Sequence, residues 1–435
     1  MPLRRIVLAV VLTFSLGGSE VRAQPIPTVA PEKVGLSSER LARIGKALNR
    51  EIEKGSIPGA VVLVARKGKI AYFESFGFLD KATGKRMPKD ALFRAYSMTK
   101  PWVSVVAMTL VEEGRLQLTE PVSKYLPTFK GLQVSVRKTD PATGAVTYEM
   151  VPAAKEPTIQ DLLRHSSGIG YDFVTTNAPV KEGLVKAGLS ALDPGFRDVS
   201  AEDQVERLAK VPLAYQPGTG WEYSLATDVL GRVIEAITGQ RLSEVVEERL
   251  LKPLQMRDSG FWVPKDKLSR IAEPFAIDPA TGQASRTFEM SQPPRTDSGG
   301  AGGVTTATDY LRFAQMMANG GKLDAARIIS RSTVALMTSD HLGTKIQPTN
   351  LAPGELLMGV PGYTFGLGFM VRQGPGIAGV PGSAGEFMWA GALGTFFWVD
   401  PKEDLVAVYM SQAGGPTRGA YRRLVKQLVS QAIVD

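Results

Sequence analysis

The residues of this chain with the clearest chemical potential are a hydroxyl and an amine, Ser97 and Lys100, in the tetrapeptide Ser-Met-Thr-Lys. Residues three positions apart share one face of a helix, so the Lys100 amine can reach the Ser97 oxygen. A neutral lysine there would take the serine proton and create a nucleophile. The pair alone is a weak signal, because a chain of 435 residues contains such a spacing by chance.

The composition leaves few other ways to activate a nucleophile. The chain has no cysteine, which excludes thiol nucleophiles and cysteine-ligated metals. Its two histidines, His165 and His341, are far apart, and neither lies in a zinc-type HExxH motif or a recognisable triad context. We interpret His165 as a structural histidine that bonds to nearby backbone. Lysine is then the obvious base, and we expect no metal and no other cofactor.

The charge pattern does not indicate a nucleic-acid partner. The formal net charge is +8, but lysines and arginines are scattered among aspartates and glutamates, without a basic run. No GxxxxGK[ST] motif supports nucleotide binding. The glycine cluster at 299–303 favours a close-packed turn over a phosphate site.

The first residues resemble a secretory signal. Arg4 and Arg5 precede an apolar run at 6–16 that is too short to span a bilayer, and small residues flank Arg22 before Gln24. We therefore expect a signal peptide at 1–23 and an exported protein, periplasmic or secreted. A retained N-terminal anchor is the alternative. No other stretch is apolar enough to cross a membrane, and the oligomeric state is left open.

The remaining pattern predicts α/β segments at both ends and a mainly helical middle. Expected helices are 38–54, 97–114, 158–163 and 419–434, with Ser97 and Thr158 as N-caps; expected strands are 60–65, 70–76, 133–137, 145–151, 365–371, 386–390, 396–399 and 405–410. No repeat or linker divides the chain. We predict one catalytic unit over 24–435, with an α/β part at about 24–94 and 300–435 and an inserted helical part at about 95–299.

Three further blocks follow Ser97 and Lys100 in order. They are His-Ser-Ser-Gly-Ile-Gly-Tyr at 165–171, Pro-Gly-Thr-Gly-Trp-Glu-Tyr-Ser-Leu at 217–225, and Trp-Ala-Gly-Ala at 389–392. Their order and spacing resemble the serine β-lactamase and penicillin-binding-protein superfamily, most closely the family VIII carboxylesterases. The resemblance extends from about residue 34 to the C-terminus. It implies a serine β-lactamase-like fold, in which an antiparallel sheet is flanked by helices and carries an inserted helical domain.

The resemblance also implies a catalytic role for each matching residue. Ser97 would be the nucleophile, Lys100 its base, and Tyr223 a phenol near the serine oxygen. The backbone N–H groups of Ser97 and Ala392 would form the oxyanion hole. An unperturbed lysine, with a pKa of about 10.4, is a poor base at neutral pH. Burial and a nearby helix N-terminus would both favour its neutral form.

The substrate pocket implied by the resemblance includes Tyr171, Leu225, Trp389 and Gly391. Leu225 occupies the position at which β-lactamases carry an asparagine that binds the substrate amide, and Trp389 replaces the lysine that binds the β-lactam carboxylate. Each lost hydrogen bond to a charged group is worth about 1.5–3 kcal/mol. These two changes favour an uncharged substrate.

The predicted function is that of an exported serine carboxylesterase acting on small-molecule, short-chain acyl esters. Three alternatives remain at this point: an enzyme that processes β-lactams, an amide hydrolase like the nylon-oligomer hydrolases of this superfamily, and a non-catalytic cell-wall-binding or regulatory protein of the same fold.

Overall fold

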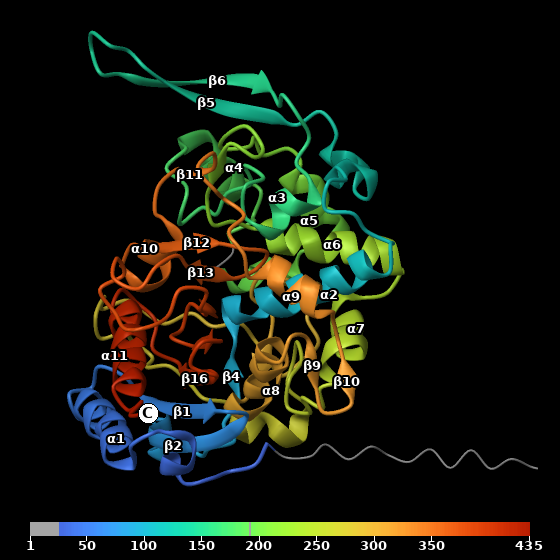
Figure 1. The fold of residues 1–435 in the computed structure, drawn as a ribbon. Helices are drawn as coiled ribbons and strands as arrows, with labels where there is room; N and C mark the ends of the chain where they lie inside the picture. Colours follow the sequence, from blue (N-terminus) through green and yellow to red (C-terminus); the bar gives the residue numbers. More distant parts are fainter. Residues whose placement is uncertain (1–25, 191–192) are drawn as a thin grey trace, which may run out of the picture.

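An antiparallel sheet of eight strands, in the order β12-β13-β14-β15-β16-β1-β2-β3, organises the molecule (Figure 1). The computed structural model describes residues 26–190 and 193–435. The predicted signal peptide at 1–23 lies outside the described residues. The two halves of the sheet come from opposite ends of the sequence and meet where β1 (Gly59–Arg66) pairs with β16 (Leu405–Ser411).

Both faces of the sheet are covered, which is why its central strands are almost continuously apolar. Every residue of β1 and of β16 is buried. On β15 (Phe396–Asp400), adjacent residues point to opposite faces. Phe397 packs against Tyr310 of α8 (Ala307–Ala318), with ring centroids 4.8 Å apart, whereas Trp398 lies 5.4 Å from Lys426 Nζ of α11 (Arg418–Ser430). Helices α8 and α11 therefore cover opposite faces.

The remaining elements have the following bounds. The other helices are α1 Ser38–Glu53, α2 Thr99–Glu112, α3 Ile159–Leu163, α4 Ala178–Lys186, α5 Ala201–Leu208, α6 Ala226–Thr238, α7 Leu242–Val246, α9 Arg331–Met337 and α10 Pro353–Met358. The other strands are β2 Lys69–Asp80, β3 Lys85–Arg86, β4 Phe93–Arg94, β5 Gln133–Thr139, β6 Val146–Pro152, β7 Gly220–Trp221, β8 Val304–Thr305, β9 Lys322–Leu323, β10 Ala326–Arg327, β11 Gln347–Pro348, β12 Tyr363–Phe365, β13 Met370–Arg372 and β14 Phe387–Ala390.

Helices α2 to α6 lie mostly beyond one end of the sheet, and the β5–β6 hairpin extends away from them at the top of Figure 1. Local sequence signals account for several of these elements. Thr158 caps α3 in a capping box with Asp161, and Gly239 ends α6 with φ of 71°, a conformation that glycine adopts without strain. None of the helices within residues 26–190 and 193–435 combines the length and the apolar character that crossing a bilayer requires.

Two local predictions were wrong. The expected single strand at 365–371 is a hairpin, because Gly366 and Gly368 turn the chain between β12 and β13. Ser97 is not the N-cap of a helix that runs to Gly114. It lies inside a 3-10 turn, Tyr96–Met98, and α2 follows as Thr99–Glu112. The antiparallel sheet flanked by helices was predicted correctly.

Candidate active site

The backbone around Ser97 is held in an unusual conformation. Tyr96 has a φ of 47°, which is rare for a residue with a bulky side chain. The conformation is fixed from both sides, because Thr99 Oγ1 donates to the Tyr96 carbonyl at 2.6 Å and accepts from the Gly303 N–H at 2.9 Å. The Tyr310 hydroxyl donates to the Met98 carbonyl at 2.9 Å. Backbone strain of this kind is typical of functional sites, where the surroundings determine the geometry.

Lys100 is the second residue of α2, three positions after Ser97, and is almost completely buried. Its Nζ lies 3.5 Å from Ser97 Oγ, donates to the Tyr171 hydroxyl at 3.0 Å, and donates to the Gly300 carbonyl at 2.8 Å. The ring of Tyr223 is also close, with its centroid 4.6 Å from Nζ. The lysine is thus directed at the serine by polar partners from three other segments of the chain.

Burial lowers the pKa of Lys100 to about 7, although the negative charge of Asp228 acts in the opposite direction. Only the neutral amine can take the Ser97 proton. We therefore expect kcat/KM to fall as the pH drops below about 7, and to be independent of pH just above it. A pH profile of ester turnover measures this acid limb, which is the pH range over which kcat/KM falls. A limb near pH 10, typical of an exposed lysine, would contradict the proposed role of Lys100.

Tyr223 brings an unpartnered hydroxyl to the same place. It follows the turn at 217–220, immediately before α6, and is buried. Its hydroxyl makes no hydrogen bond of normal geometry within the described part of the chain, although it is close enough to Ser97 and Trp389 for both to influence its pKa. Burial raises that pKa above the usual range. The hydroxyl is therefore protonated at neutral pH and available to a bound substrate.

An aromatic cluster positions Tyr223. Its ring packs edge-on against Tyr171, Trp389 and His165, with centroids 5.2, 5.2 and 4.9 Å away. His165 is buried, its Nδ1 lies 3.0 Å from Ser224 Oγ, and burial lowers its pKa well below the usual value. This neutral histidine supports the position of Tyr223, and neither it nor His341 bonds to Ser97 in the regions that the structure covers.

Two backbone donors face the same space. Among the described residues, the N–H groups of Ser97 and Ala392 have no acceptor. Gly391 lets the segment that leads to Ala392 pack closely on the segment that leads to Ser97. A side chain at position 391 would overlap the Ala95 carbonyl and Thr395 Oγ1. Paired free N–H groups next to a nucleophile can bind the oxyanion of an acyl-transfer intermediate.

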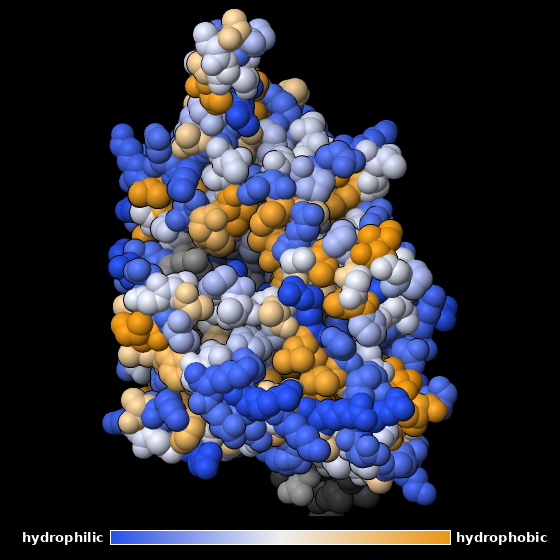
Figure 2. Space-filling view, turned by 90° about the vertical axis from the view of Figure 1, so that its left-hand side faces the viewer, coloured by the Kyte–Doolittle hydropathy of each residue, from blue (hydrophilic) through white to orange (hydrophobic). Residues whose placement is uncertain are grey.

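A cavity of about 240 Å³ unites these groups. It is lined by Tyr96, Ser97, Tyr171, Phe173, Tyr223, Ala301, Leu356, Leu357, Trp389, Ala390, Gly391, Ala392, Arg418 and Arg422. Figure 2 shows the side of the molecule on which α10 and α11 lie, where hydrophobic residues form several patches across the middle of the surface. Most of the residues predicted for the site thus lie around one cavity, to which five aromatic side chains contribute.

Leu225 is the exception among the predicted pocket residues. It is not part of this lining and is about 1% exposed. Its side chain borders a separate, much smaller apolar space, together with Leu189, Phe196 and Val229. The position that carries an amide in β-lactamases is therefore part of the apolar interior here.

Sequence reasoning missed the two arginines of the cavity. Arg418 and Arg422 lie one turn apart on α11, and no carboxylate within the described residues forms an ion pair with either. Arg422 donates to the Gly391 carbonyl at 2.6 Å, and burial lowers its pKa to about 9. The i, i+4 spacing was visible in the sequence. Nothing there indicated that the C-terminal helix reaches the site.

Possible metal ligands are not clustered in the part of the chain that the structure describes. Within 26–190 and 193–435, no group of three or more histidine, aspartate or glutamate side chains is placed to hold a metal ion. The chemistry that can be derived from this geometry uses protein groups alone.

Comparison with known proteins identifies relatives of this chain. The family model described as Beta-lactamase matches residues 43–431. Esterase EstB of Burkholderia gladioli is 33% identical over 391 residues, which cover 82% of this chain and 87% of EstB. Lovastatin esterase of Penicillium rubens is 29% identical over 394 residues, covering 86% and 94%. The solved structure of EstCE1, a hydrolase with promiscuous acyltransferase activity, has a TM-score of 0.71 and 25% identity, with 90% and 98% covered.

Proposed function

Since the chain belongs to the β-lactamase family and is a serine hydrolase with esterase relatives, we propose that it is a carboxylesterase that hydrolyses short-chain acyl esters through an acyl-enzyme on Ser97. This proposal rests on one observation: Ser97, an unpartnered Tyr223 hydroxyl and two free backbone N–H groups belong to one cavity, and the buried Lys100 contacts Ser97.

In acylation, neutral Lys100 accepts the Ser97 proton at Nζ while Ser97 Oγ bonds to the ester carbonyl carbon. The carbonyl oxygen becomes an oxyanion, which the N–H groups of Ser97 and Ala392 stabilise. The bond from carbon to the alcohol oxygen then breaks, and the Tyr223 hydroxyl protonates the leaving alkoxide. The Lys100 ammonium returns a proton to Tyr223. Such acid–base assistance is typically worth about 10²–10⁴-fold.

In deacylation, a water takes the place of the alcohol. Neutral Lys100, with Tyr223 as relay, removes a proton from the water as its oxygen bonds to the acyl carbon. The bond to Ser97 Oγ breaks, and the serine recovers its proton as the carboxylic acid leaves. No other residue needs to change its protonation state, so His165 can stay neutral throughout.

The principal alternative substrate class is the β-lactams, and one observation favours it. Trp389 removes the family's lysine from block three, but Arg418 and Arg422 return positive charge to the same cavity. An anionic substrate is therefore not excluded by charge alone. The missing amide partner still argues against β-lactams, because Leu225 faces an apolar space.

We expect kcat/KM for p-nitrophenyl acetate and butyrate to exceed that for a chromogenic cephalosporin by orders of magnitude. Trp389 stands where the family's lysine would bind the carboxylate of a cephalosporin, and kcat/KM compares transition-state binding directly. The measurement is a panel of acyl-chain lengths beside the cephalosporin. A wild-type preference for the cephalosporin would replace the esterase proposal with the β-lactamase alternative.

The variant Leu225→Asn tests whether the preference for esters depends on the side chain at position 225. Because Leu225 borders a mostly apolar space outside the cavity, an asparagine there would bury a polar amide, at a cost of about 1–3 kcal/mol in stability. We expect a lower Tm and little gain in cephalosporin turnover. Trp389→Lys, inside the cavity, should raise the ratio of cephalosporin to ester turnover more. A large gain with Leu225→Asn would show that this side chain reaches the substrate.

A further inference from the structure

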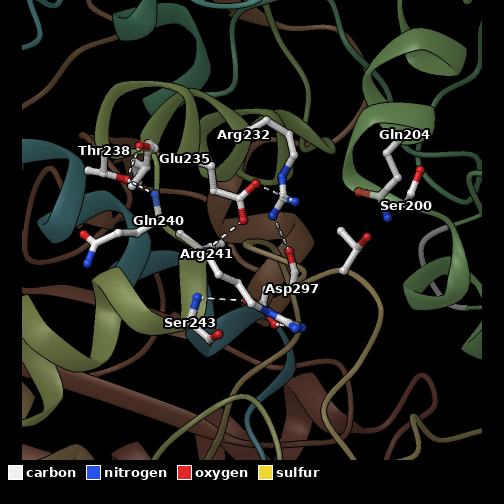
Figure 3. Close-up of polar contacts among 12 residues, drawn as sticks. Ser200, Gln204, Arg232, Glu235, Thr238, Gln240, Arg241, Ser243 and Asp297 are labelled. Atoms are coloured by element: carbon white, nitrogen blue, oxygen red, sulfur yellow. Dashed lines mark hydrogen bonds and ion pairs between the residues drawn. The ribbon is translucent and has the colours of Figure 1, made fainter.

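The loop that carries Gly300 to Lys100 is anchored by a polar network on α6 and α7, shown in Figure 3. The carboxylate of Asp297, at the start of the loop, accepts from Arg241 Nε at 2.8 Å and from the Ser243 backbone N–H at 2.9 Å. Arg232 of α6 donates to the Asp297 carbonyl at 2.6 Å and pairs with Glu235 at 2.9 Å. The loop is thus held at Asp297 by contacts with α6 and the start of α7.

Asp228 binds the same loop at Ser298 and Gly300. It lies one turn before Arg232 on α6 and is buried. One of its carboxylate oxygens, Oδ1, accepts from Ser298 Oγ at 2.6 Å and from the Gly300 backbone N–H at 3.0 Å. The carbonyl of that same Gly300 accepts from Lys100 Nζ at 2.8 Å. A continuous chain of hydrogen bonds therefore connects Asp228 to the amine of Lys100.

The second oxygen of Asp228 faces the lysine more directly. A methyl group added to the Gly300 Cα would overlap Asp228 Oδ2 and lie 3.1 Å from Lys100 Nζ. Both charged atoms thus border the same small space, which only a glycine leaves open. Opposite charges at this separation favour each other's ionised form.

No other carboxylate contributes to this environment among the described residues. The titratable groups around Lys100 are the hydroxyls of Tyr171 and Tyr223, both with raised pKa values, and His165, whose pKa is lowered. All three are neutral near pH 7. Asp228 is the one negative charge that influences the pKa of Lys100. A base works best when its pKa is near the working pH. Burial alone would lower the pKa of the amine below that pH.

We propose that Asp228 is a positioning residue for Lys100: it holds the Gly300 carbonyl against the amine, and its negative charge offsets the burial that weakens the amine as a base. This inference rests on the proposed function, because it takes Lys100 as the base that activates Ser97. Asp228 does not line the cavity that holds Ser97 and acts only through its neighbours.

The test is the pH profile of Asp228→Asn. Asparagine can accept the same two hydrogen bonds through its carbonyl oxygen, so the loop keeps its place while the charge is lost. We expect the acid limb of kcat/KM to move to lower pH by about 1–3 units, the usual effect of losing an opposite charge within about 4–6 Å. The rate at which a fluorophosphonate labels Ser97 should shift in the same way. An unchanged limb in a folded variant overturns the inference.

Asp297→Asn is the matched control. It weakens the anchoring of the same loop at position 297 without removing the Asp228 charge. The Tm of the variant should therefore fall while the acid limb stays in place. An equal shift in both variants would mean that loop anchoring, not the Asp228 charge, sets the limb. If Asp228→Asn does not fold, Gly300→Ala tests the same point, because its methyl group would separate the carboxylate from the amine. Its acid limb should also move to lower pH, and an unchanged limb counts against the inference.

Labelling also separates this inference from the proposed function. If wild type labels at Ser97 but turns over no ester, the proposed function fails, and the pH dependence of labelling still tests Asp228. If wild type labels nowhere, Lys100 does not activate Ser97 and both fail.

Discussion

Ser97→Ala is expected to lose essentially all ester turnover, at least about 10³-fold, and to keep its fold. The change removes one oxygen atom, and with it the bond that acylation must form. The serine lies in a 3-10 turn whose conformation is fixed by Thr99 and Tyr310, so the backbone does not depend on the Ser97 hydroxyl. Steady-state turnover of p-nitrophenyl butyrate, beside circular dichroism and Tm, measures both expectations.

Ser104→Ala is a suitable control for this experiment. Ser104 is a buried serine of α2, the helix that follows the Ser97 turn, and it does not line the cavity. Its alanine variant should retain ester turnover. An active Ser97→Ala variant would mean that a different residue is the nucleophile.

Lys100→Ala and Tyr223→Phe are each expected to reduce kcat by about 10²–10⁴-fold. The double variant should lose far less than the product of the two single losses, because residues that share one proton relay are not additive. Tyr223→Phe is a clean change, since the hydroxyl that it removes makes no hydrogen bond of normal geometry in the described structure. The measurement is a double-mutant cycle on kcat with one ester.

Multiplicative losses would show that Lys100 and Tyr223 act in separate steps. Tyr171→Phe extends the cycle, because the Tyr171 hydroxyl, unlike that of Tyr223, accepts from Lys100 directly. If only the Tyr171 variant couples to Lys100, then Tyr171 is the relay in place of Tyr223.

The sequence predicted the fold and the family well, for identifiable reasons. Apolar strands at 60–65 and 405–410 are typical of a sheet covered on both faces, and they pair with each other inside the sheet. The spacing of Ser97 and Lys100 predicted their contact, since it depends only on local helical geometry. The order of the motif blocks predicted the family, which the family model and the esterase relatives confirm.

Long-range features of the site could not be predicted in the same way. Arg418 and Arg422 reach the cavity only because α11 packs across the sheet, and that depends on the whole fold. Leu225 has the expected place in its motif, but local packing directs its side chain into an apolar space. Asp228 is unremarkable in the sequence, and its relation to Lys100 appears only when the loop at 297–303 closes over both.

Some predictions remain open. The signal peptide at 1–23, and with it export, lies outside the described residues. The division into an α/β part and an inserted helical part at about 95–299 also stays a prediction, as do the individual roles of the site residues. The short acyl chain of the substrate is part of the proposed function.

Labelling with a fluorophosphonate, followed by peptide mass spectrometry, identifies the nucleophile of the reaction. The phosphorus would take the place of the ester carbonyl carbon, and the adduct would record which oxygen attacks. The account predicts one adduct per chain, on the peptide that contains Ser97, formed in parallel with the loss of ester turnover. An adduct on another residue, or full turnover in the labelled protein, would contradict it.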